Sequence, residues 1–393
     1  MMKYIKLSKE IENQIKEKIN LPVENPIRRD ENHDKANLWR PAFVRDIEKI
    51  MHCPYYNRYS DKTQVFSFYR NDDLSRRALH VQIVSRIARN IGKMLGLNLD
   101  LIEAIALGHD MGHTPFGHTG EKILSNIYNE KTGRYFNHNV HSVRVLDKML
   151  GYNITLQTLS GILCHNGEME LETYAPKKLE SFDEFDKIVE KCYTIKDYSS
   201  CLVPSTLEGC VVRICDIIAY IGKDRQDAIK TKLISDENIF SDSHIGKFNA
   251  MIINNLIVNI VENSFDKDYI KLDKEYFEAL KQCKRDNYDL IYLSDNVGQK
   301  NYKIVEPMFY KLYEKLLSDL KSGDEDALIF KHHIEYVENL TKYYKNANYR
   351  ETEPNQIVVD YIASMTDDYF VELYDKYFPN ENRIKYISYF DQE

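Results

Sequence analysis

The chain has 393 residues with a formal net charge of −8, and 43% of its residues are hydrophobic. A chain of this length can bury a large core, and its acidic balance excludes a generally basic nucleic-acid coat protein. It has neither the roughly 18 consecutive apolar residues of a membrane helix nor an apolar segment typical of a secretion signal. Seven cysteines without a CxxC pair therefore predict reduced thiols in a cytoplasmic protein.

Charge is unevenly distributed along the chain. Residues 40–93 contain 11 Lys/Arg and 5 Asp/Glu, whereas residues 351–393 contain 3 and 10. The basic segment is either solvated surface or a site that attracts a phosphate-bearing ligand, and the sequence leaves both open. Seven of the 12 histidines lie between His80 and His165. A single histidine on an apolar helix is usually a core residue, but this concentration, accompanied by acids, favours a metal or catalytic site.

The spacing of apolar residues predicts helices through most of the chain. The first runs from His80 to Met94 and stops at Gly96, and the next covers 99–110 with Asn98 as its cap. Residues Thr114–Gly117 break the pattern before helices over 118–130, 137–150 and 156–165.

The second half continues the helical pattern. A capping box at Ser205–Glu208 predicts a long helix that ends near Lys230. Residues 167–202 are charged and aperiodic, which predicts a loop. Residues 248–265 and 354–378 have helical patterns, and a short strand pair is expected within 270–305. The prediction is a mostly all-α protein with an amino-terminal arm (1–45), a central helical core (46–232) and a mainly helical carboxy-terminal region (233–393).

Four residues form a candidate metal site. His109 and Asp110 are adjacent near a helix end, where their side chains point about 100° apart and can both reach one ion beside the helix. A divalent cation needs further ligands, and His80 lies one helix upstream. Asp216 is surrounded by apolar neighbours in the long helix, so its carboxylate needs a cation or hydrogen-bond donors. Arg213 is the alternative partner for Asp216.

Longer motifs surround these residues. In chain order they are KTQVF (62–66), RRALH (76–80), GHDMGHTPFGHTGE (108–121), FNHNVHSVRVL (136–146), HNGE (165–168), PSTLEGCVVRICDIIAYIGKD (204–224) and DYIASMTDDY (360–369). From about residue 26 to 375 the chain resembles the HD-domain deoxynucleoside triphosphate triphosphohydrolases, or dGTPases. The resemblance implies an HD-domain helical core at 46–232 and a helical carboxy-terminal extension that completes the nucleotide pocket and an oligomer interface. It also implies hydrolysis of a dNTP at the α-phosphate to a deoxynucleoside and inorganic triphosphate.

The resemblance also implies the roles of individual residues. His80, His109, Asp110 and Asp216 would hold one divalent metal ion. His118 and Glu121, one helical turn apart, match the family's catalytic pair. His138 matches another active-site position and competes with His118 for the role of general acid; the sequence leaves this assignment open.

Substrate contacts follow from the same resemblance. Arg77 would lie beside the α-phosphate, Gln64 would bind the sugar 3′-hydroxyl, and Tyr220 would pack under the sugar where a ribose 2′-hydroxyl would clash. Further candidates for nucleotide contacts are His113, Asp224, Lys62, Arg58, Tyr361 and Asp367, with His141 and His165 expected less.

Two functions are alternatives to the hydrolysis of dNTPs. One is another HD phosphohydrolase, such as a nucleoside monophosphatase. The other is a non-catalytic HD regulator that binds nucleotides or single-stranded nucleic acid. The sequence does not select the metal among Mn, Mg, Fe, Co, Ni and Zn. Family members form homo-oligomers, usually tetramers or hexamers, and some need a nucleotide as allosteric effector; neither property is visible in this sequence.

Overall fold

A computed structural model describes residues 5–18, 25–166, 171–294, 299–341, 348–381 and 384–389. Helices dominate these residues, which confirms the predicted mostly all-α class. None of the described helices is both long and apolar enough to span a membrane. The helices are α1 (Lys9–Lys18), α2 (Ala42–Met51), α3 (Pro54–Asn57), α4 (Arg77–Met94), α5 (Leu99–Gly108), α6 (Gly117–Thr132), α7 (His138–Arg144), α8 (Leu156–Cys164), α9 (Phe182–Thr194), α10 (Leu207–Lys230), α11 (Asn249–Ser264), α12 (Lys274–Asn287), α13 (Gln299–Ser322), α14 (Glu335–Thr341), α15 (Pro354–Ser364) and α16 (Asp367–Tyr377).

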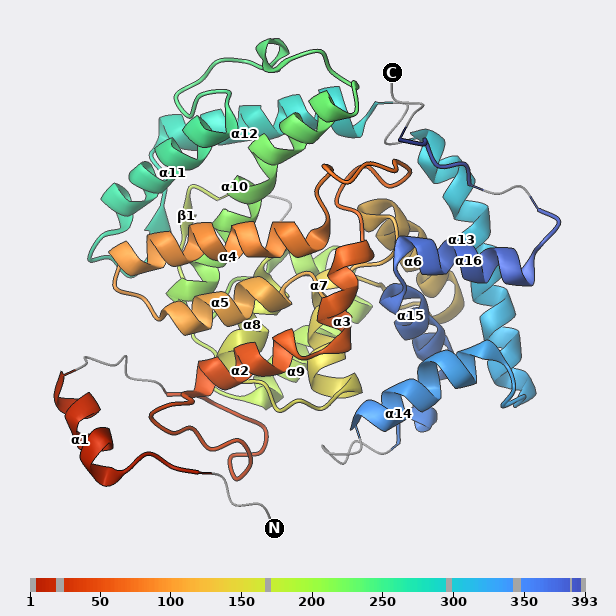
Figure 1. The fold of residues 1–393 in the computed structure, drawn as a ribbon, viewed down its shortest axis with the longest axis horizontal. Helices are drawn as coiled ribbons and strands as arrows, with labels where there is room; N and C mark the ends of the chain where they lie inside the picture. The colour runs from red at the N-terminus through yellow and green to blue at the C-terminus, as the bar shows by residue number, and fades with distance from the viewer. Residues whose placement is uncertain are drawn as a thin grey trace.

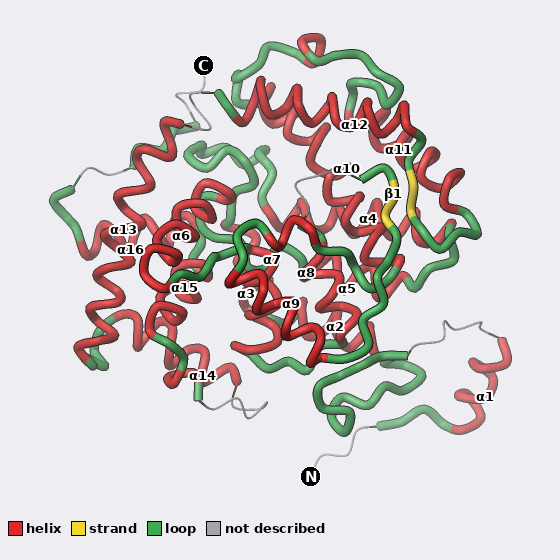
Figure 2. Tube along the Cα trace, turned by 180° about the vertical axis from the view of Figure 1, so that it is seen from behind, coloured by secondary structure: helices red, strands yellow, loops and turns green. Residues whose placement is uncertain are grey.

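Helices α4, α5, α8 and α10 pack on one another at the centre of the molecule (Figure 1). Helices α13, α15 and α16 lie together on one side of this centre, and α11 and α12 lie on another, as the reverse view in Figure 2 also shows. Helix α1 lies apart from the body and buries no side chain. The apolar core extends from Phe43 to Ile384, so the central and carboxy-terminal helices share it.

The starts of the central helices follow local sequence signals. Asn98 accepts hydrogen bonds from the backbone N–H groups of Asp100 and Leu101 and caps α5 as predicted. Helix α10 also begins where expected, but its cap is Thr206, which accepts from the Gly209 N–H. The predicted capping box is therefore wrong in detail, because the Glu208 carboxylate instead accepts from the backbone N–H of Asn98.

Two other predictions are wrong. The segment expected to be a loop contains α9, because Ser181 caps it and Phe185, Cys192 and Tyr193 are buried; residues 167–170 of that segment lie outside the described residues. The expected strand pair within 270–305 is also absent from the described part of that range. Instead β2 (Ile270–Lys271) pairs antiparallel with β1 (Thr173–Tyr174), and residues 274–287 form α12.

Helices α5 and α8 approach each other through reciprocal glycine–isoleucine contacts. A Cβ atom at Gly161 of α8 would lie 2.4 Å from Ile105 Cδ1 of α5, and one at Gly108 of α5 would lie 2.7 Å from Ile162 Cδ1 of α8. Both distances are too short for a real methyl group, so larger residues would separate the helices. The contacts bring the carboxy-terminal ends of the two helices together.

This contact predicts that Gly161→Ala lowers the free energy of unfolding by about 1–3 kcal/mol, because the added methyl group overpacks the helix interface. Urea denaturation monitored by circular dichroism measures the change. Ile105→Ala removes all three carbon atoms, Cδ1, Cγ1 and Cγ2, that the added methyl group would meet, so the double variant should lose less stability than the two single losses added together. Purely additive losses would show that Gly161 and Ile105 do not limit the approach of the helices.

Candidate metal and catalytic site

The Asp110 carboxylate is the centre of the site. Asp110 follows α5 and is only 4% exposed. Its Oδ2 atom accepts a 2.6 Å hydrogen bond from Arg77 Nη1 at the start of α4. Five imidazole Nε2 atoms lie close to one or other oxygen: those of His80 (3.9 Å), His109 (3.4 Å), His113 (3.6 Å), His138 (3.9 Å) and His165 (3.7 Å). Burial raises the pKa of Asp110, but His109 and Arg77 outweigh it, so the pKa lies well below the usual range.

The protein fixes the orientation of His109. Its Nδ1 atom lies 2.8 Å from the backbone oxygen of Ala106, which can only accept, so Nδ1 carries the proton. The buried Nε2 atom therefore presents a lone pair, and it makes no hydrogen bond to any described residue. An orphaned acceptor of this kind, with its other nitrogen held by a carbonyl, is typical of a metal-binding histidine.

Asp216 and His80 face this nitrogen from α10 and α4. Asp216 Oδ1 lies 2.9 Å from His80 Nε2 and 3.7 Å from His109 Nε2. Burial raises the pKa of Asp216, but the hydrogen bond from His80 and the electrostatic interaction with His109 lower it to about 2. The described structure thus brings together all four residues predicted to bind metal, and Arg213, the alternative partner of Asp216, instead donates to the backbone oxygen of Leu202.

These donors fit a divalent metal ion. The ligand atoms of His80, His109 and Asp110 lie within 4.8 Å of one another, as do those of His109, His165 and Asp216. Imidazole nitrogens combined with carboxylate oxygens suit Zn, Fe, Mn, Co or Ni.

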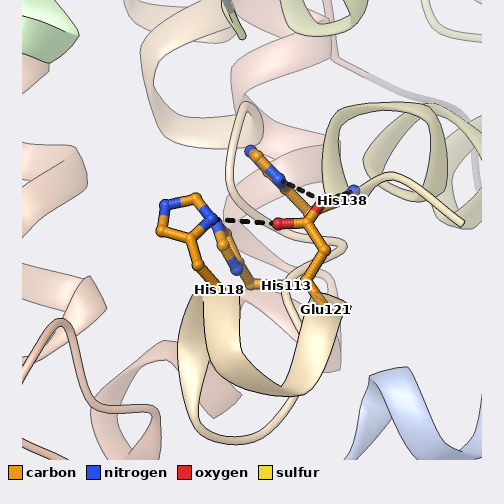
Figure 3. Close-up of side chains that lie close together, drawn as sticks. All are labelled: His113, His118, Glu121 and His138. Atoms are coloured by element: carbon orange, nitrogen blue, oxygen red, sulfur yellow. Dashed lines mark hydrogen bonds and ion pairs between the residues drawn. The ribbon is translucent and has the colours of Figure 1, made fainter. Parts of the chain in front are cut away.

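A second group of side chains lies next to Asp110 and joins α6 to α7. Figure 3 shows its members, His113, His118, Glu121 and His138. Glu121 is the link between two histidines: its Oε2 lies 3.0 Å from His118 Nδ1, and its Oε1 lies 2.8 Å from His138 Nδ1. Oε1 also accepts a 2.7 Å hydrogen bond from the backbone N–H of His138. The His113 ring stacks on the His138 ring with centroids 3.9 Å apart. His118 is the exposed member, with 77% of its side chain accessible.

The contacts of His138 define its protonation. Its Nδ1 faces the Glu121 carboxylate, and its Nε2 lies 3.1 Å from His165 Nε2. His165 holds its proton on Nδ1, which donates to the backbone oxygen of Ile162, so its Nε2 is an acceptor. Both His138 nitrogens therefore face acceptors, which only the imidazolium form can satisfy.

The pKa shifts agree with this assignment. Burial lowers the pKa of His138, but Glu121 outweighs it and the net pKa is raised. Burial and the neighbouring His109 lower the pKa of His165 to about 3, so it stays neutral. The pKa of His113 is also well below its usual value, because of burial and the Arg77 charge. Burial raises the pKa of Glu121, yet His138 and His118 bring it below its usual range.

Close backbone packing holds the turn after Asp110 against α7. A Cβ atom at Gly112 would lie 2.3 Å from the Ser142 nitrogen and 2.4 Å from the His138 oxygen, so only glycine fits. The Ser142 oxygen lies 2.6 Å from the backbone oxygen of His109 and 2.9 Å from that of His138, either of which can accept its single proton, and it accepts from the Gly112 N–H. These contacts fix the spacing between the two groups of side chains.

Two predicted substrate-binding residues, Arg77 and Gln64, lie beside this centre. Two others, Tyr220 and Asp224, lie on the helix that carries Asp216. A Cβ atom at Gly117 would lie 3.3 Å from both Arg77 Nη2 and the Gln64 backbone oxygen, which places these residues side by side. The Gln64 Oε1 atom is buried and has no hydrogen-bond partner among the described residues. Tyr220 and Asp224 continue along α10 from Asp216; Asp224 accepts a hydrogen bond from Tyr292, and burial raises its pKa to about 7.

His113, described above, is a ninth predicted contact, and the remaining four form hydrogen bonds within the protein itself. The Lys62 ammonium donates to the backbone oxygens of His113 and Ala363, and Arg58 donates to that of Ser364. Asp367 accepts from the Thr63 hydroxyl and from the Phe116 N–H. The Tyr361 hydroxyl contacts that of Tyr369 at 2.6 Å, and its ring stacks on His333. A nucleotide contact for these residues remains a prediction.

His165 is the site residue to which the sequence gave too little weight. It lies 3.7 Å from Asp110 and contacts His138, and its ring lies 4.6 Å from that of His109. Its position in the sequence could have indicated this role, because His165 directly follows α8 just as His109 directly follows α5. His141 lies away from this centre, where its Nδ1 is 3.7 Å from Asp360 and burial lowers its pKa to about 4.

Two family models match the chain. The model described as "HD domain" covers residues 77–221, which include His80, His109, Asp110 and Asp216. The model described as "Phosphohydrolase-associated domain" covers residues 270–376, which form much of the carboxy-terminal helical part.

Several bacterial proteins are similar over most of the chain. The protein of Caldanaerobacter subterraneus subsp. tengcongensis is 32% identical over 348 residues, which is 86% of this chain and 85% of the relative. That of Clostridium perfringens (strain SM101) is 32% identical over 366 residues, or 89% of each chain. That of Clostridium tetani is 30% identical over 359 residues, covering 88% of this chain and 87% of the relative. All three are named deoxyguanosinetriphosphate triphosphohydrolase-like protein.

The geometry predicts that Asp216→Ala lowers divalent-metal affinity by about tenfold or more, since loss of even an outer partner of a metal ligand costs about 10–100-fold. Calorimetric titration with Mn²⁺ measures the affinity, and circular dichroism checks the helical content. The control is Asp224→Asn, two helical turns along α10, which should bind Mn²⁺ like the wild type. Unchanged Mn²⁺ affinity in Asp216→Ala would remove this residue from the metal site.

Proposed function

Because the chain belongs to the HD-domain family of deoxyguanosinetriphosphate triphosphohydrolase-like proteins, which are metal-dependent phosphohydrolases, we propose that it hydrolyses deoxynucleoside triphosphates at the α-phosphate. The products are a deoxynucleoside and inorganic triphosphate. One observation carries the proposal: two metal-ligand candidates, His80 and His109, and the Glu121-linked His138 all lie within 4 Å of the Asp110 carboxylate. Hydrolysis of a phosphoester needs both an electrophilic centre and proton transfer, and the two groups supply them side by side.

His80, His109, Asp110 and Asp216 would hold the metal ion. When bound, a divalent cation polarises a phosphoryl oxygen and stabilises the charge that develops on it. Arg77 is already placed beside Asp110, so its guanidinium is available to bind an oxygen of the α-phosphate. His113, beneath the His138 ring, is neutral and buried, and its Nδ1 has no partner among the described residues, so it suits a hydrogen bond to a phosphate oxygen.

The Glu121-linked histidines would transfer the protons. The imidazolium of His138 is suited to be the general acid that protonates the leaving 5′-oxygen, because its pKa is raised by Glu121. His118 donates through Nδ1 to Glu121, which leaves its Nε2 as an acceptor for a proton of the attacking water. The water then adds its oxygen to the α-phosphorus as the bond to the 5′-oxygen breaks.

The sugar would lie between Gln64 and the helix that carries Tyr220 and Asp224. The Gln64 amide oxygen is a buried acceptor, which favours a contact with the 3′-hydroxyl. We propose that Tyr220 excludes a 2′-hydroxyl by its bulk and thereby selects deoxyribose. From the family membership we further propose that the enzyme works in the cytoplasm as a homo-oligomer.

The proposal predicts that dGTP with Mn²⁺ yields deoxyguanosine and inorganic triphosphate in equal amounts, which ³¹P NMR and chromatography detect. GTP should be hydrolysed more slowly by about tenfold or more, since a steric clash with one hydroxyl group opposes binding. Release of monophosphate or pyrophosphate would contradict cleavage at the α-phosphate. Release of orthophosphate from dGMP alone would instead support a nucleoside monophosphatase, and no turnover with retained dGTP binding would support a regulator.

The geometry also predicts that His118 and Glu121 act as one unit. His118→Ala and Glu121→Ala should each lower kcat by about 10²-fold or more with Mn²⁺ binding retained, because proton transfer by a positioned side chain contributes about that much. The double variant should be little worse than the worse single variant. Steady-state kinetics with dGTP and calorimetric Mn²⁺ titration measure both effects.

The control for this pair is Lys122→Ala, which changes an exposed residue of the same helix next to Glu121. Its kcat should equal that of the wild type. If the losses of His118→Ala and Glu121→Ala simply multiply in the double variant, the two residues act independently and the proposed unit is wrong.

A further inference from the structure

Lys62 and Thr63 lie where three segments of the active site meet. The backbone oxygen of Lys62 accepts a 3.1 Å hydrogen bond from the N–H of Arg77, the first residue of α4. Thr63 continues this contact as an isolated antiparallel bridge with Arg76. The backbone of this segment is therefore tied to the start of the helix that carries Arg77 and His80.

The side chains of the same two residues extend in the other direction. The Lys62 ammonium bonds the His113 oxygen, in the turn before α6, and the Ala363 oxygen at the end of α15, the latter at 2.8 Å. Lys62 is 2% exposed, so these carbonyls replace water around its charge. The Thr63 hydroxyl donates to Asp367, the first residue of α16.

Asp367 completes the connection to the catalytic turn. Its Oδ1 atom accepts a 3.1 Å hydrogen bond from the backbone N–H of Phe116, two residues before His118. Phe116 has a φ of 61°, in the left-handed region that a bulky residue rarely adopts. Its ring packs against Phe370 of α16 and Phe309 of α13. This strained conformation persists only because its surroundings hold it from several sides.

We propose that Asp367, together with Lys62 and Thr63, positions the 113–121 turn and helix for catalysis, and that Asp367 does not bind the nucleotide. The kinetic test of this inference rests on the proposed function. Both carboxylate oxygens of Asp367 are engaged by protein donors, and the residue is 3% exposed. By holding Phe116, Asp367 sets the direction in which the chain enters α6 and hence the position of His118 and Glu121.

Steady-state kinetics with dGTP and Mn²⁺ separate positioning from binding. Asp367→Ala should lower kcat by about tenfold or more while KM changes by less than about threefold, since a positioning residue acts on the transition state rather than on substrate binding. Asp367→Asn should recover most of kcat, because the amide oxygen can accept from Phe116 and the amide nitrogen can donate to Thr63. A rise in KM with kcat unchanged in Asp367→Ala would overturn the proposal in favour of a nucleotide contact.

Hydrogen–deuterium exchange tests the same contact and does not require the protein to be enzymatically active. In Asp367→Ala, peptides covering 111–121 should exchange faster, while peptides of α4 should exchange as in the wild type. The control is Asp368→Ala, because this neighbouring carboxylate accepts from Tyr386 instead. If Asp367→Ala fails to fold, Thr63→Val removes one donor to the carboxylate and should give the same direction of change.

The two failures are distinguishable. Unchanged exchange over 111–121 in a folded Asp367→Ala or Thr63→Val variant overturns the positioning role, whatever the enzyme hydrolyses. Faster exchange in a protein whose wild type releases no triphosphate from dGTP supports the positioning role and refutes the proposed function.

Discussion

The burial of one ionised carboxylate, that of Asp110, is the constraint on which the centre of this protein depends. An unpaired charge removed from water costs several kcal/mol, so a buried carboxylate needs cations or donors around it. Arg77 supplies one charged hydrogen bond, and five imidazoles lie within 4 Å of its two oxygens. These groups come from α4, α7, the residues that follow α5 and α8, and the turn before α6. The helices must therefore meet closely enough for all of these side chains to reach one point.

Glycines make this convergence possible. Gly108 and Gly161 let the ends of α5 and α8 approach, and Gly112 lets the turn after Asp110 touch the backbone of α7. A Cβ atom at any of these three positions would lie less than 2.8 Å from an atom of a neighbouring residue. The apolar packing and the polar centre therefore depend on each other. Gly161 and Ile105 lie one helical turn before His165 and His109, so their contact fixes the distance between the two histidine rings.

Sequence reasoning predicted the parts of this arrangement that depend on local patterns. Helix periodicity and the Asn98 cap placed α4 and α5, and the adjacency of His109 and Asp110 identified the metal candidates. It placed too little weight on His165 because the direction of that ring depends on how α8 docks against α5. It missed α9 although Phe185, Ile188, Val189 and Cys192 recur at helical spacing, because the many charged residues of the segment were given more weight than this spacing. Nor could sequence show that Arg58 and Lys62 donate to the backbone oxygens of Ser364 and Ala363, since those oxygens lie about 300 residues away along the chain.

Contacts within the protein explain part of the charge asymmetry of the sequence. The basic segment 40–93 supplies Arg58 and Lys62, and both donate to carbonyl oxygens at the carboxy-terminal end of α15, where the helix dipole places partial negative charge. The acidic segment 351–393 supplies Asp367 to the first turn of α16, where the dipole is positive.

The same two segments meet again farther along. Arg70 lies over the Tyr386 ring with 5.0 Å between its guanidinium carbon and the ring centroid, and Tyr389 donates to Asp72. Three of the cations that suggested a phosphate site, Arg58, Lys62 and Arg70, thus attach the carboxy-terminal part of the chain to the HD core. Among the basic residues with described contacts in this segment, Arg77 is the one whose guanidinium faces Asp110, at the centre of the candidate metal site, so under the proposed function it is the one best placed to bind the triphosphate.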